Sequence, residues 1–294
     1  MHFLKKHTDS LRSLLQSNNY REKDYSEKKY PKITVITPSY NQAAFLERTI
    51  LSVLNQQYPN LEYIIIDGGS NDDSVAIIKK YEQYLTYWVS EKDRGQVHAI
   101  NKGLERASGD YISFQNSDDV YFPNAFANLA DAALQQDDDI LFGDLYMTTI
   151  NDEVTEQLKT TSYSLDCQLL EGMQIHNQSL FFKKSLILKY GYFDESYRFT
   201  FDYEFITRFT VDKSTTTRKV SGLAGALRVH ADAKSSTIAE TVGLTEHERV
   251  QKKYIHYLGP NSPTKIKYLW CRIRKFVYFA TQFDFKYILY RFTR

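Results

Sequence analysis

The chain has 294 residues, 42% of them hydrophobic and 25% charged, and a formal net charge of +1. This length and composition predict a soluble protein with one large core, or one domain with an appendage. The two cysteines, Cys167 and Cys271, show no CxxC or Cys/His ligand spacing, which argues against a disulfide framework or a zinc site and favours a reducing compartment.

Two further features bear on location. No uncharged apolar run approaches the length of about 18 residues that a membrane-spanning helix needs, so we expect no segment to cross a bilayer. The N-terminal stretch MHFLKKHTDSLRSLL lacks the continuous apolar core of a secretory signal. We therefore expect a cytoplasmic protein.

Strand and helix patterns alternate along residues 31–146, after a polar N-terminal arm over 1–30. Continuous apolar runs predict strands, and apolar residues at helical spacing predict amphipathic helices. In chain order we expect strands over 32–40, 62–70, 86–93, 110–116 and 139–146, with helices over 41–57, 74–85, 95–109 and 123–136. This order predicts an α/β fold with a mostly parallel central sheet and helices on both faces.

The pattern loosens after about residue 150. Here we expect strands over 181–187 and 223–230, a helix within 196–211, and a further helix over 242–258. The segment 264–294 then carries eight Lys or Arg against one Asp, together with ten aromatic residues. This composition is typical of an amphipathic element at an anionic membrane surface, or equally of a helix that closes the core and turns a basic face to water. No nucleic-acid-binding module accompanies it, so we predict no nucleic-acid partner.

Polar residues follow four of the predicted strands at the point where each strand ends. In parallel sheets, ligands bind outside the carboxyl ends of the strands. We therefore expect four polar segments to converge on one edge of the sheet: 39–41, 67–70, 90–94 and 116–119.

The last of these segments ends in two adjacent carboxylates, Asp118 and Asp119. Consecutive side chains of an extended segment point to opposite sides, so one acid can face a metal ion while the other meets another part of the same ligand. Mg²⁺ and Mn²⁺ favour oxygen ligands and are commonly shared with substrate phosphates. The alternative is an Asx-type turn that binds nothing.

Three stretches resemble the family 2 glycosyltransferases: TPSYNQAAFLERTILSVLNQQYPNLEYIIIDGGSNDDS, SEKDRGQVHAINKGLERASGDYISFQNSDD and FDESYRFTFDYEF. The resemblance covers about residues 32–230 and is nearest to bacterial enzymes of cell-surface polysaccharide assembly. It implies a GT-A fold over 31–240, with a nucleotide-sugar-binding half (31–122) and an acceptor-binding half (123–240), followed by a helical basic and aromatic extension (241–294). Gln115 stands where relatives often have Leu, a change that leaves the acidic pair intact.

The resemblance also implies an activity and its partners. We expect a metal-dependent inverting transfer from a nucleotide-diphosphate sugar, with a UDP-sugar as the donor and Mn²⁺ or Mg²⁺ as the cofactor. The acceptor would be a hydroxyl of a glycan or a lipid-linked saccharide, in cell-surface polysaccharide biosynthesis. Such an acceptor would suit peripheral membrane contact through 264–294.

By the same resemblance, Asp119 binds the metal and Asp118 contacts the donor ribose or the ion. Asp67 meets the nucleobase, with Thr37 and Ser39 lining the same pocket; alternatively, Asp67 only closes the turn before Gly68 and Gly69. The remaining binding candidates are Asp93, Arg94, Lys102, Asn116, His176 and Gln178, with His230 as a third metal ligand. Lys102 is equally consistent with a helix surface, and His176 with a structural histidine.

The acceptor hydroxyl needs a base, because an alcohol is a poor nucleophile at neutral pH. Asp202, in the sequence Phe201-Asp202-Tyr203-Glu204, matches a variant of the family's acidic motif at the start of a helix and is the predicted catalytic base. Glu204 is the fallback base. The competing role for Asp202 is to cap the helix, worth about 0.5–2 kcal/mol.

Two other functions remain open at this stage. A non-catalytic sugar-nucleotide-binding subunit of a polysaccharide assembly complex would keep the donor pocket without needing Asp202. A nucleotidyltransferase shares the strand-end arrangement but usually has a Gly-rich phosphate loop, which TPSYNQA lacks.

Overall fold

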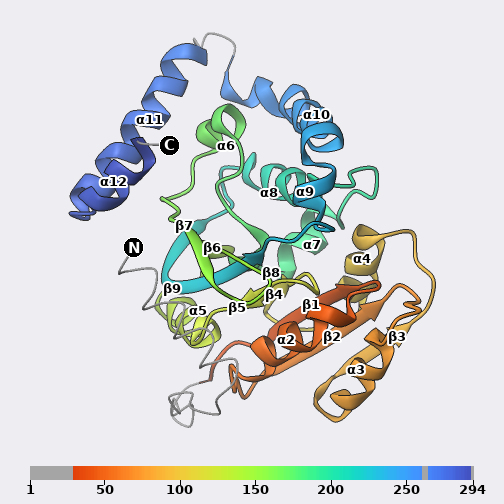
Figure 1. Cartoon of the computed structure of the whole chain (residues 1–294). Coiled ribbons are helices and arrows are strands. Elements are labelled where there is room, and N and C mark those ends of the chain that lie inside the picture. The colour runs from red at the N-terminus through yellow and green to blue at the C-terminus, as the bar shows by residue number, and fades with distance from the viewer. Residues whose placement is uncertain (1–28, 260–263, 293–294) are drawn as a thin grey trace.

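The computed structural model describes residues 29–259 and 264–292, and most of the predicted N-terminal arm lies outside them (Figure 1). A nine-stranded sheet in the order β3-β2-β1-β4-β8-β6-β9-β5, with β7 paired to β6, forms the centre. The strands are β1 (Ile33–Ser39), β2 (Leu61–Asp67), β3 (Tyr87–Ser90), β4 (Tyr111–Phe114), β5 (Val120–Tyr121), β6 (Ile140–Thr148), β7 (Val154–Leu158), β8 (Leu180–Lys183) and β9 (Thr217–Arg228).

The helices surround this sheet. In chain order they are α2 (Ala43–Leu54), α3 (Ser74–Lys80), α4 (Gln96–Arg106), α5 (Ala125–Gln135), α6 (Leu165–Glu171), α7 (Lys184–Tyr190), α8 (Phe201–Thr210), α9 (Lys234–Thr237), α10 (Leu244–Tyr254), α11 (Thr264–Thr281) and α12 (Phe285–Phe292). Four short irregular helices join them: η1 (Glu82–Tyr84), η2 (Asn177–Ser179), η3 (Ala239–Gly243) and η4 (Ile255–Leu258).

The first half of the sheet is parallel, as predicted. β1 pairs in parallel with both β2 and β4, and β2 pairs in parallel with β3. Every residue of β1 is buried, and so is β2 after its first residue. Their continuous apolar sequences therefore reflect helices on both faces, which is why they do not alternate between apolar and polar residues.

The second half of the sheet mixes directions. β8 is antiparallel to β4 and β6, whereas β9 is parallel to β6 and antiparallel to β5. The predicted strand over 181–187 is wrong beyond Lys183, because α7 begins at Lys184. Leu186 and Ile187 are buried in the core from this helix, so their apolar character comes from helix packing and not from a strand.

Two apolar layers enclose the parallel strands. Val35 packs in the layer with Leu46 and Phe126, on the side of α2 and α5. Its neighbour Ile36 packs in the opposite layer, with residues of α4 and α8. At Gly103 in α4, an added Cβ would lie 2.4 Å from Ile36, so this glycine lets the helix approach the sheet closely.

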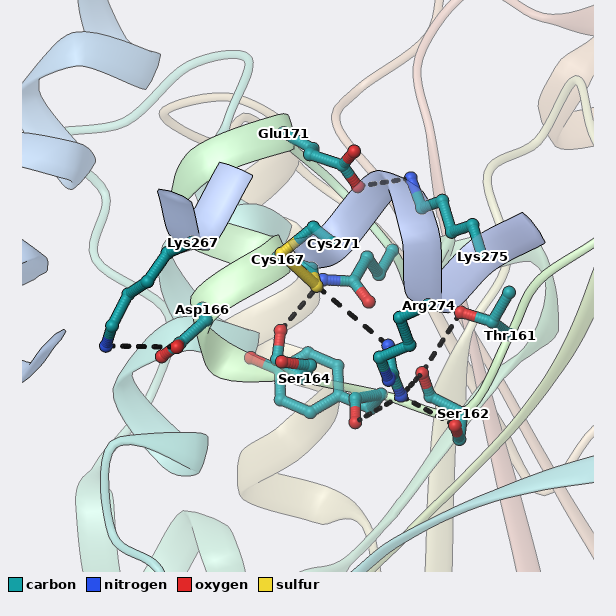
Figure 2. Close-up of a disulfide and its surroundings, with 12 residues drawn as sticks. Thr161, Ser162, Ser164, Asp166, Cys167, Glu171, Lys267, Cys271, Arg274 and Lys275 are labelled. Atoms are coloured by element: carbon teal, nitrogen blue, oxygen red, sulfur yellow. Dashed lines mark hydrogen bonds and ion pairs between the residues drawn. A yellow bond between two sulfur atoms is a disulfide. The ribbon is translucent and has the colours of Figure 1, made fainter. Parts of the chain in front are cut away.

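α11 and α12 lie at the periphery of the molecule, with α11 over α6 (Figures 1 and 2). A disulfide joins Cys167 in α6 to Cys271 in α11, across 104 residues of sequence. The sequence-based argument against a disulfide is therefore wrong. It relied on local spacing, whereas the fold brings the two Cα atoms to 5.5 Å, a normal disulfide separation. The cysteine pattern consequently gives no support for a reducing compartment.

Candidate functional site

A cavity of about 910 Å³ lies at the carboxyl ends of the parallel strands, a volume typical of small-molecule sites. One part of its lining lies at or after the ends of β1 to β4 and includes Ser39, Gly68, Gly69, Asp93, Arg94, Asn116, Asp118 and Asp119. The predicted convergence of the strand-end residues is thus confirmed. Further lining comes from residues 95–99 at the start of α4 and from the second half of the chain, mainly within 173–178, 195–203 and 232–235.

Asp119 is fully buried, and donors surround its carboxylate. Asn116 and Gln178 donate side-chain N–H groups to Oδ2 at 3.0 and 2.8 Å, and the backbone N–H of Arg228 donates to Oδ1 at 3.1 Å. Burial and then the charge of Asp118 raise the pKa of Asp119 well above its usual range. Asp119 therefore organises the base of the cavity together with Asn116 and Gln178.

Asp118 is oriented differently. Its Oδ2 lies 3.0 Å from Nε2 of His230, the second residue after β9. The His230 ring packs against Phe45 in a tilted arrangement, with ring centroids 4.5 Å apart, and its buried Nδ1 has no hydrogen-bond partner within 29–259 or 264–292. The structure thus brings the predicted third ligand, 112 residues away in sequence, to the first carboxylate of the pair.

Arg228 holds the two acids in these positions. Its fully buried guanidinium pairs with Asp152 at 2.8 Å and donates to the backbone carbonyl of Asp118 at 2.7 Å. A buried arginine needs such a complete set of acceptors. Sequence reasoning missed Arg228 because its partners are far away in sequence.

Asp67 builds the turn after β2. Its buried carboxylate accepts hydrogen bonds from the backbone N–H groups of Gly69 (3.1 Å) and Ser70 (2.8 Å) and from the hydroxyls of Ser70 (2.5 Å) and Ser90 (2.6 Å). It does not line the cavity, although Gly68 and Gly69 do. These contacts correspond to the alternative role predicted for it.

The other residues predicted near the nucleotide fall into two groups. Thr37 is buried against the Tyr63 hydroxyl at 3.1 Å, and Lys102 pairs with Glu91; neither lines the cavity. Ser39 does line it, and its buried hydroxyl has no partner in the described part of the chain. An unsatisfied buried hydroxyl at a cavity wall is a natural contact for a polar ligand.

Arg94 and Glu195 connect two parts of the cavity rim. Arg94 donates to the Glu195 carboxylate from Nε at 2.9 Å and from Nη2 at 2.8 Å, a bidentate ion pair across 101 residues. Both side chains line the cavity, and Asp93 lies beside them with its Oδ1 accepting from the Gly95 N–H at 2.7 Å.

Asp202 lines the cavity from the first turn of α8. In the part of the chain that the structure describes, the hydrogen bond to its carboxylate comes from the backbone N–H of Tyr203, at 2.8 Å. The backbone N–H groups of Arg198, Phe199 and Thr200, before the helix, are instead satisfied by Glu246 of α10, at 2.6–2.9 Å. The Tyr203 N–H is one of the first-turn donors of α8, so this bond fits the capping role predicted as the alternative for Asp202. It engages Oδ1 and leaves Oδ2 of this cavity-lining residue without a hydrogen-bond partner among the other described residues.

Burial raises the pKa of Asp202 to about 7. Its side chain is half-buried, so a ligand in the cavity can reach it. A carboxylate with such a pKa is a good proton acceptor near neutral pH.

Glu204, the fallback base, lies outside the cavity. It is almost completely buried and contacts Arg208 at 3.2 Å, Lys253 at 3.0 Å and the Tyr254 hydroxyl at 2.7 Å. These partners tie α8 to α10, which gives Glu204 a structural role.

His176 lines the cavity near Asp144, and burial lowers the pKa of its imidazole to about 4. It is therefore neutral at physiological pH, and it can accept or donate a hydrogen bond without carrying charge.

The family follows from the sequence and the structure together. The sequence model of Glycosyl transferase family 2 matches residues 34–200, more than half of the chain. The chain belongs to glycosyltransferase family 2. Its nine-stranded mixed sheet and surrounding helices form the GT-A fold that was predicted.

Several family 2 relatives support this assignment. An uncharacterised glycosyltransferase of Mycobacterium tuberculosis (strain ATCC 25618 / H37Rv) is 35% identical over 190 residues, which cover 60% of this chain and 68% of the relative. TuaG of Bacillus subtilis (strain 168), named for teichuronic acid biosynthesis, is 43% identical over 96 residues, covering 31% of this chain and 37% of TuaG.

Two solved structures share the fold. Residues 1-349 of S. aureus TarS, in complex with UDP-GlcNAc, superpose with a TM-score of 0.62 at 18% identity, covering 80% of this chain and 69% of that one. The mannosyltransferase PcManGT from Pyrobaculum calidifontis, in complex with GDP-Man and Mn²⁺, superposes with a TM-score of 0.56 at 18% identity, covering 92% and 78%.

This glycosyltransferase also has two basic residues at the cavity that sequence reasoning missed, Arg198 and Lys234. Lys234 donates to the side-chain oxygen of Gln96 at 2.7 Å, and Gln96 in turn donates to Asn116 at 2.6 Å. A chain of polar contacts thus runs from Lys234 across the cavity to the residue that supports Asp119. The sequence feature that could have pointed to Lys234 is its position four residues after His230, a predicted metal ligand.

Proposed function

We propose that this family 2 glycosyltransferase moves a sugar from a nucleotide-diphosphate sugar, with a UDP-sugar as the donor, to a hydroxyl of a glycan or lipid-linked acceptor in cell-surface polysaccharide biosynthesis. One observation carries the proposal: Asp118, whose carboxylate contacts the imidazole of His230, and a separate carboxylate, Asp202, line the same cavity. An inverting transfer in one displacement needs two acidic sites with different duties.

The relatives support the donor class. The TarS structure contains UDP-GlcNAc, and the PcManGT structure contains GDP-Man and Mn²⁺, so proteins of this fold bind nucleotide sugars with different bases and sugars. The name of TuaG supports polysaccharide assembly as the setting.

The donor atoms at Asp118 and His230 fit a divalent cation. Asp118 Oδ2 and His230 Nε2 lie 3.0 Å apart, so both atoms could bind one ion. A carboxylate suits Mn²⁺ and Mg²⁺ alike, whereas an imidazole suits a transition metal, so the pair favours Mn²⁺. When bound, the ion stabilises as a Lewis acid the negative charge that develops on the departing diphosphate.

This assignment changes the expected duties of the tandem acids. Asp119 already accepts three hydrogen bonds, which leaves little of its carboxylate free for an ion. We therefore assign Asp118 as the direct ligand, with His230, and Asp119 as the residue that fixes the loop carrying it.

The remaining side chains serve the sugar and the acceptor. Arg198 and Lys234 place two positive charges at the cavity, where they attract the diphosphate of the donor. Asp202 accepts the proton of the acceptor hydroxyl as the new glycosidic bond forms and the diphosphate leaves. Its single hydrogen bond to Tyr203 leaves carboxylate lone pairs available for that proton.

The test is a screen of nucleotide-sugar donors that reads released nucleotide diphosphate, with Mn²⁺, Mg²⁺ or EDTA. We expect release from one donor class, loss in EDTA, and a decrease of about 100-fold or more in Asp118→Asn. Asp73→Asn is the matched control, because Asp73 is an exposed aspartate outside the cavity. Turnover that survives both EDTA and Asp118→Asn rejects the metal assignment. Donor binding without turnover, for every donor tested, indicates the non-catalytic subunit instead.

A further inference from the structure

α11 and α12 attach to the rest of the protein through one side only. On α11, Cys271 forms the disulfide with Cys167, and Arg274 donates to the backbone and side chain of Ser162 (Figure 2). Lys267 pairs with Asp166 at 3.0 Å and Lys275 with Glu171 at 2.6 Å. These contacts fix the rotation of α11 about its own axis.

The opposite side of α11 is apolar and exposed. Ile266, Leu269, Ile273 and Phe276 recur every three or four residues, which places them on one helix face, and their exposed fractions are 64%, 58%, 53% and 48%. We call these four residues the outer face of α11. Trp270 and Val277 extend it at one edge, each about half exposed.

Exposed apolar residues gather at this end of the protein. Of the twenty large hydrophobic side chains that are exposed among the described residues, ten belong to residues 266–289. Phe283, in the turn between α11 and α12, is 83% exposed and Phe285 is 55% exposed. Isolated exposed apolar residues are ordinary, but a contiguous apolar face of this kind marks an interaction surface.

Positive charges occur on both helices of this segment, Lys265 and Arg272 on α11 and Lys286 on α12. Lys265, Arg272 and Lys286 are exposed and make no ion pair with any residue of 29–259 or 264–292. The acidic residue of this segment, Asp284, is already paired with Lys159. The segment therefore carries both an apolar stripe and uncompensated cations.

We infer that the outer face of α11 and the turn to α12 bind an anionic phospholipid surface, with α11 lying in the plane of the headgroups. Apolar side chains enter the boundary between headgroups and acyl chains, and Lys265, Arg272 and Lys286 meet lipid phosphates. None of the helices in the described ranges is long and apolar enough to cross a membrane.

A second copy of the chain is a poorer occupant for this face. In a two-fold symmetric dimer the same patch occurs on both partners, so the unpaired cations of one copy would approach those of the other. An anionic lipid surface has no such conflict, and it supplies the negative charges that the segment lacks.

The experiment is co-sedimentation of the full chain with vesicles of phosphatidylcholine alone or mixed with phosphatidylglycerol. We expect partitioning onto the anionic vesicles, weakening with salt, and about tenfold or greater loss in Leu269→Glu/Ile273→Glu. The control is Leu134→Glu/Leu188→Glu, which makes the same chemical change at exposed leucines of α5 and α7 and should bind like the wild type.

Three readouts keep the inference falsifiable. Nucleotide-sugar turnover without vesicles should be equal in the wild type and both double variants, so that failure of lipid binding is distinguishable from failure of the proposed function. Equal vesicle binding by both double variants overturns the inference, as does absence of binding to anionic vesicles. A wild-type dimer that becomes a monomer in Leu269→Glu/Ile273→Glu, without lipid binding, assigns the face to a second copy instead.

Discussion

On the side of the cavity formed by the parallel strands, the carboxylates of Asp67 and Asp119 accept four and three hydrogen bonds. On the side formed by α8, the carboxylate of Asp202 accepts one. The first two are fully buried, whereas Asp202 is half-buried and lines the cavity. A carboxylate with a complete set of donors shapes the backbone around it, and one with unused lone pairs is available to a substrate.

The same difference separates the two acids of α8. Asp202 and Glu204 are two residues apart, so their side chains leave the helix in different directions. Glu204 has three partners from α8 and α10, whereas among the described residues the carboxylate of Asp202 accepts one hydrogen bond, from the backbone N–H of its neighbour Tyr203. Hydrogen-bond saturation therefore distinguishes the candidate base from its fallback more clearly than sequence position does.

The largest expected effect comes from removing the base. Asp202→Asn keeps the shape of the side chain but cannot accept the acceptor proton, so we expect kcat to fall by about 10²–10⁴-fold. Affinity for the nucleotide diphosphate should be unchanged, because Asp202 serves the acceptor. Transfer assays and calorimetric titration with the nucleotide measure the two quantities. If the variant retains wild-type turnover, Asp202 is not the base.

The next effect is a pH dependence that reports on the same carboxyl. Because burial raises the pKa of Asp202 to about 7 and the base acts only when ionised, kcat should fall about tenfold per pH unit below that value and level off above it. The measurement is kcat against pH at saturating donor. If kcat is constant between about pH 5 and 9, either the pKa of Asp202 is not raised or Asp202 is not the catalytic base.

The stability of the fold should change with pH in the opposite sense. The pKa of Asp202 is higher in the folded protein, about 7, than the ordinary value of 3.8, so its ionisation as the pH rises between these values disfavours folding. Asp202→Asn should therefore gain unfolding free energy relative to the wild type over this window. Denaturant titrations at the two ends of this pH window measure the difference in unfolding free energy between the variant and the wild type. If this difference is the same at both ends, the pKa of Asp202 is not raised by burial in the folded protein.

The sequence could predict one side of the cavity well, for a physical reason. β1 to β4 are continuous apolar runs with polar residues at their ends, and parallel pairing alone brings those ends together. Asp118, Asp119, Ser39 and Asp93 were therefore placed at the cavity from local patterns. The fold class followed from the same alternation of strands and helices.

The other side depends on long-range packing that local patterns do not encode. His230 meets Asp118 because β9 inserts between β6 and β5, and Glu246 reaches the backbone N–H groups before α8 because α10 packs on α8. Arg228 and Lys234 acquire their roles only through such contacts. The same reasoning explains Cys167 and Cys271, whose pairing across 104 residues had no local signal.

The smallest expected effect is on stability, and it tests whether the fully hydrogen-bonded carboxylate of Asp67 is structural. The carboxylate of Asp67 accepts four hydrogen bonds with its two oxygens. In Asp67→Asn one of these oxygens becomes an NH₂ group, which faces other donors and cannot accept from them. We therefore expect the free energy of unfolding to fall by about 1–3 kcal/mol. Asp73→Asn, at an exposed aspartate six residues on, should stay within about 0.5 kcal/mol of the wild type. Denaturant unfolding measures both. Asp67→Asn could instead leave stability unchanged and weaken binding of the nucleotide. In that case the Asp67 carboxylate contacts the nucleobase, even though four hydrogen bonds occupy it in the protein without ligand.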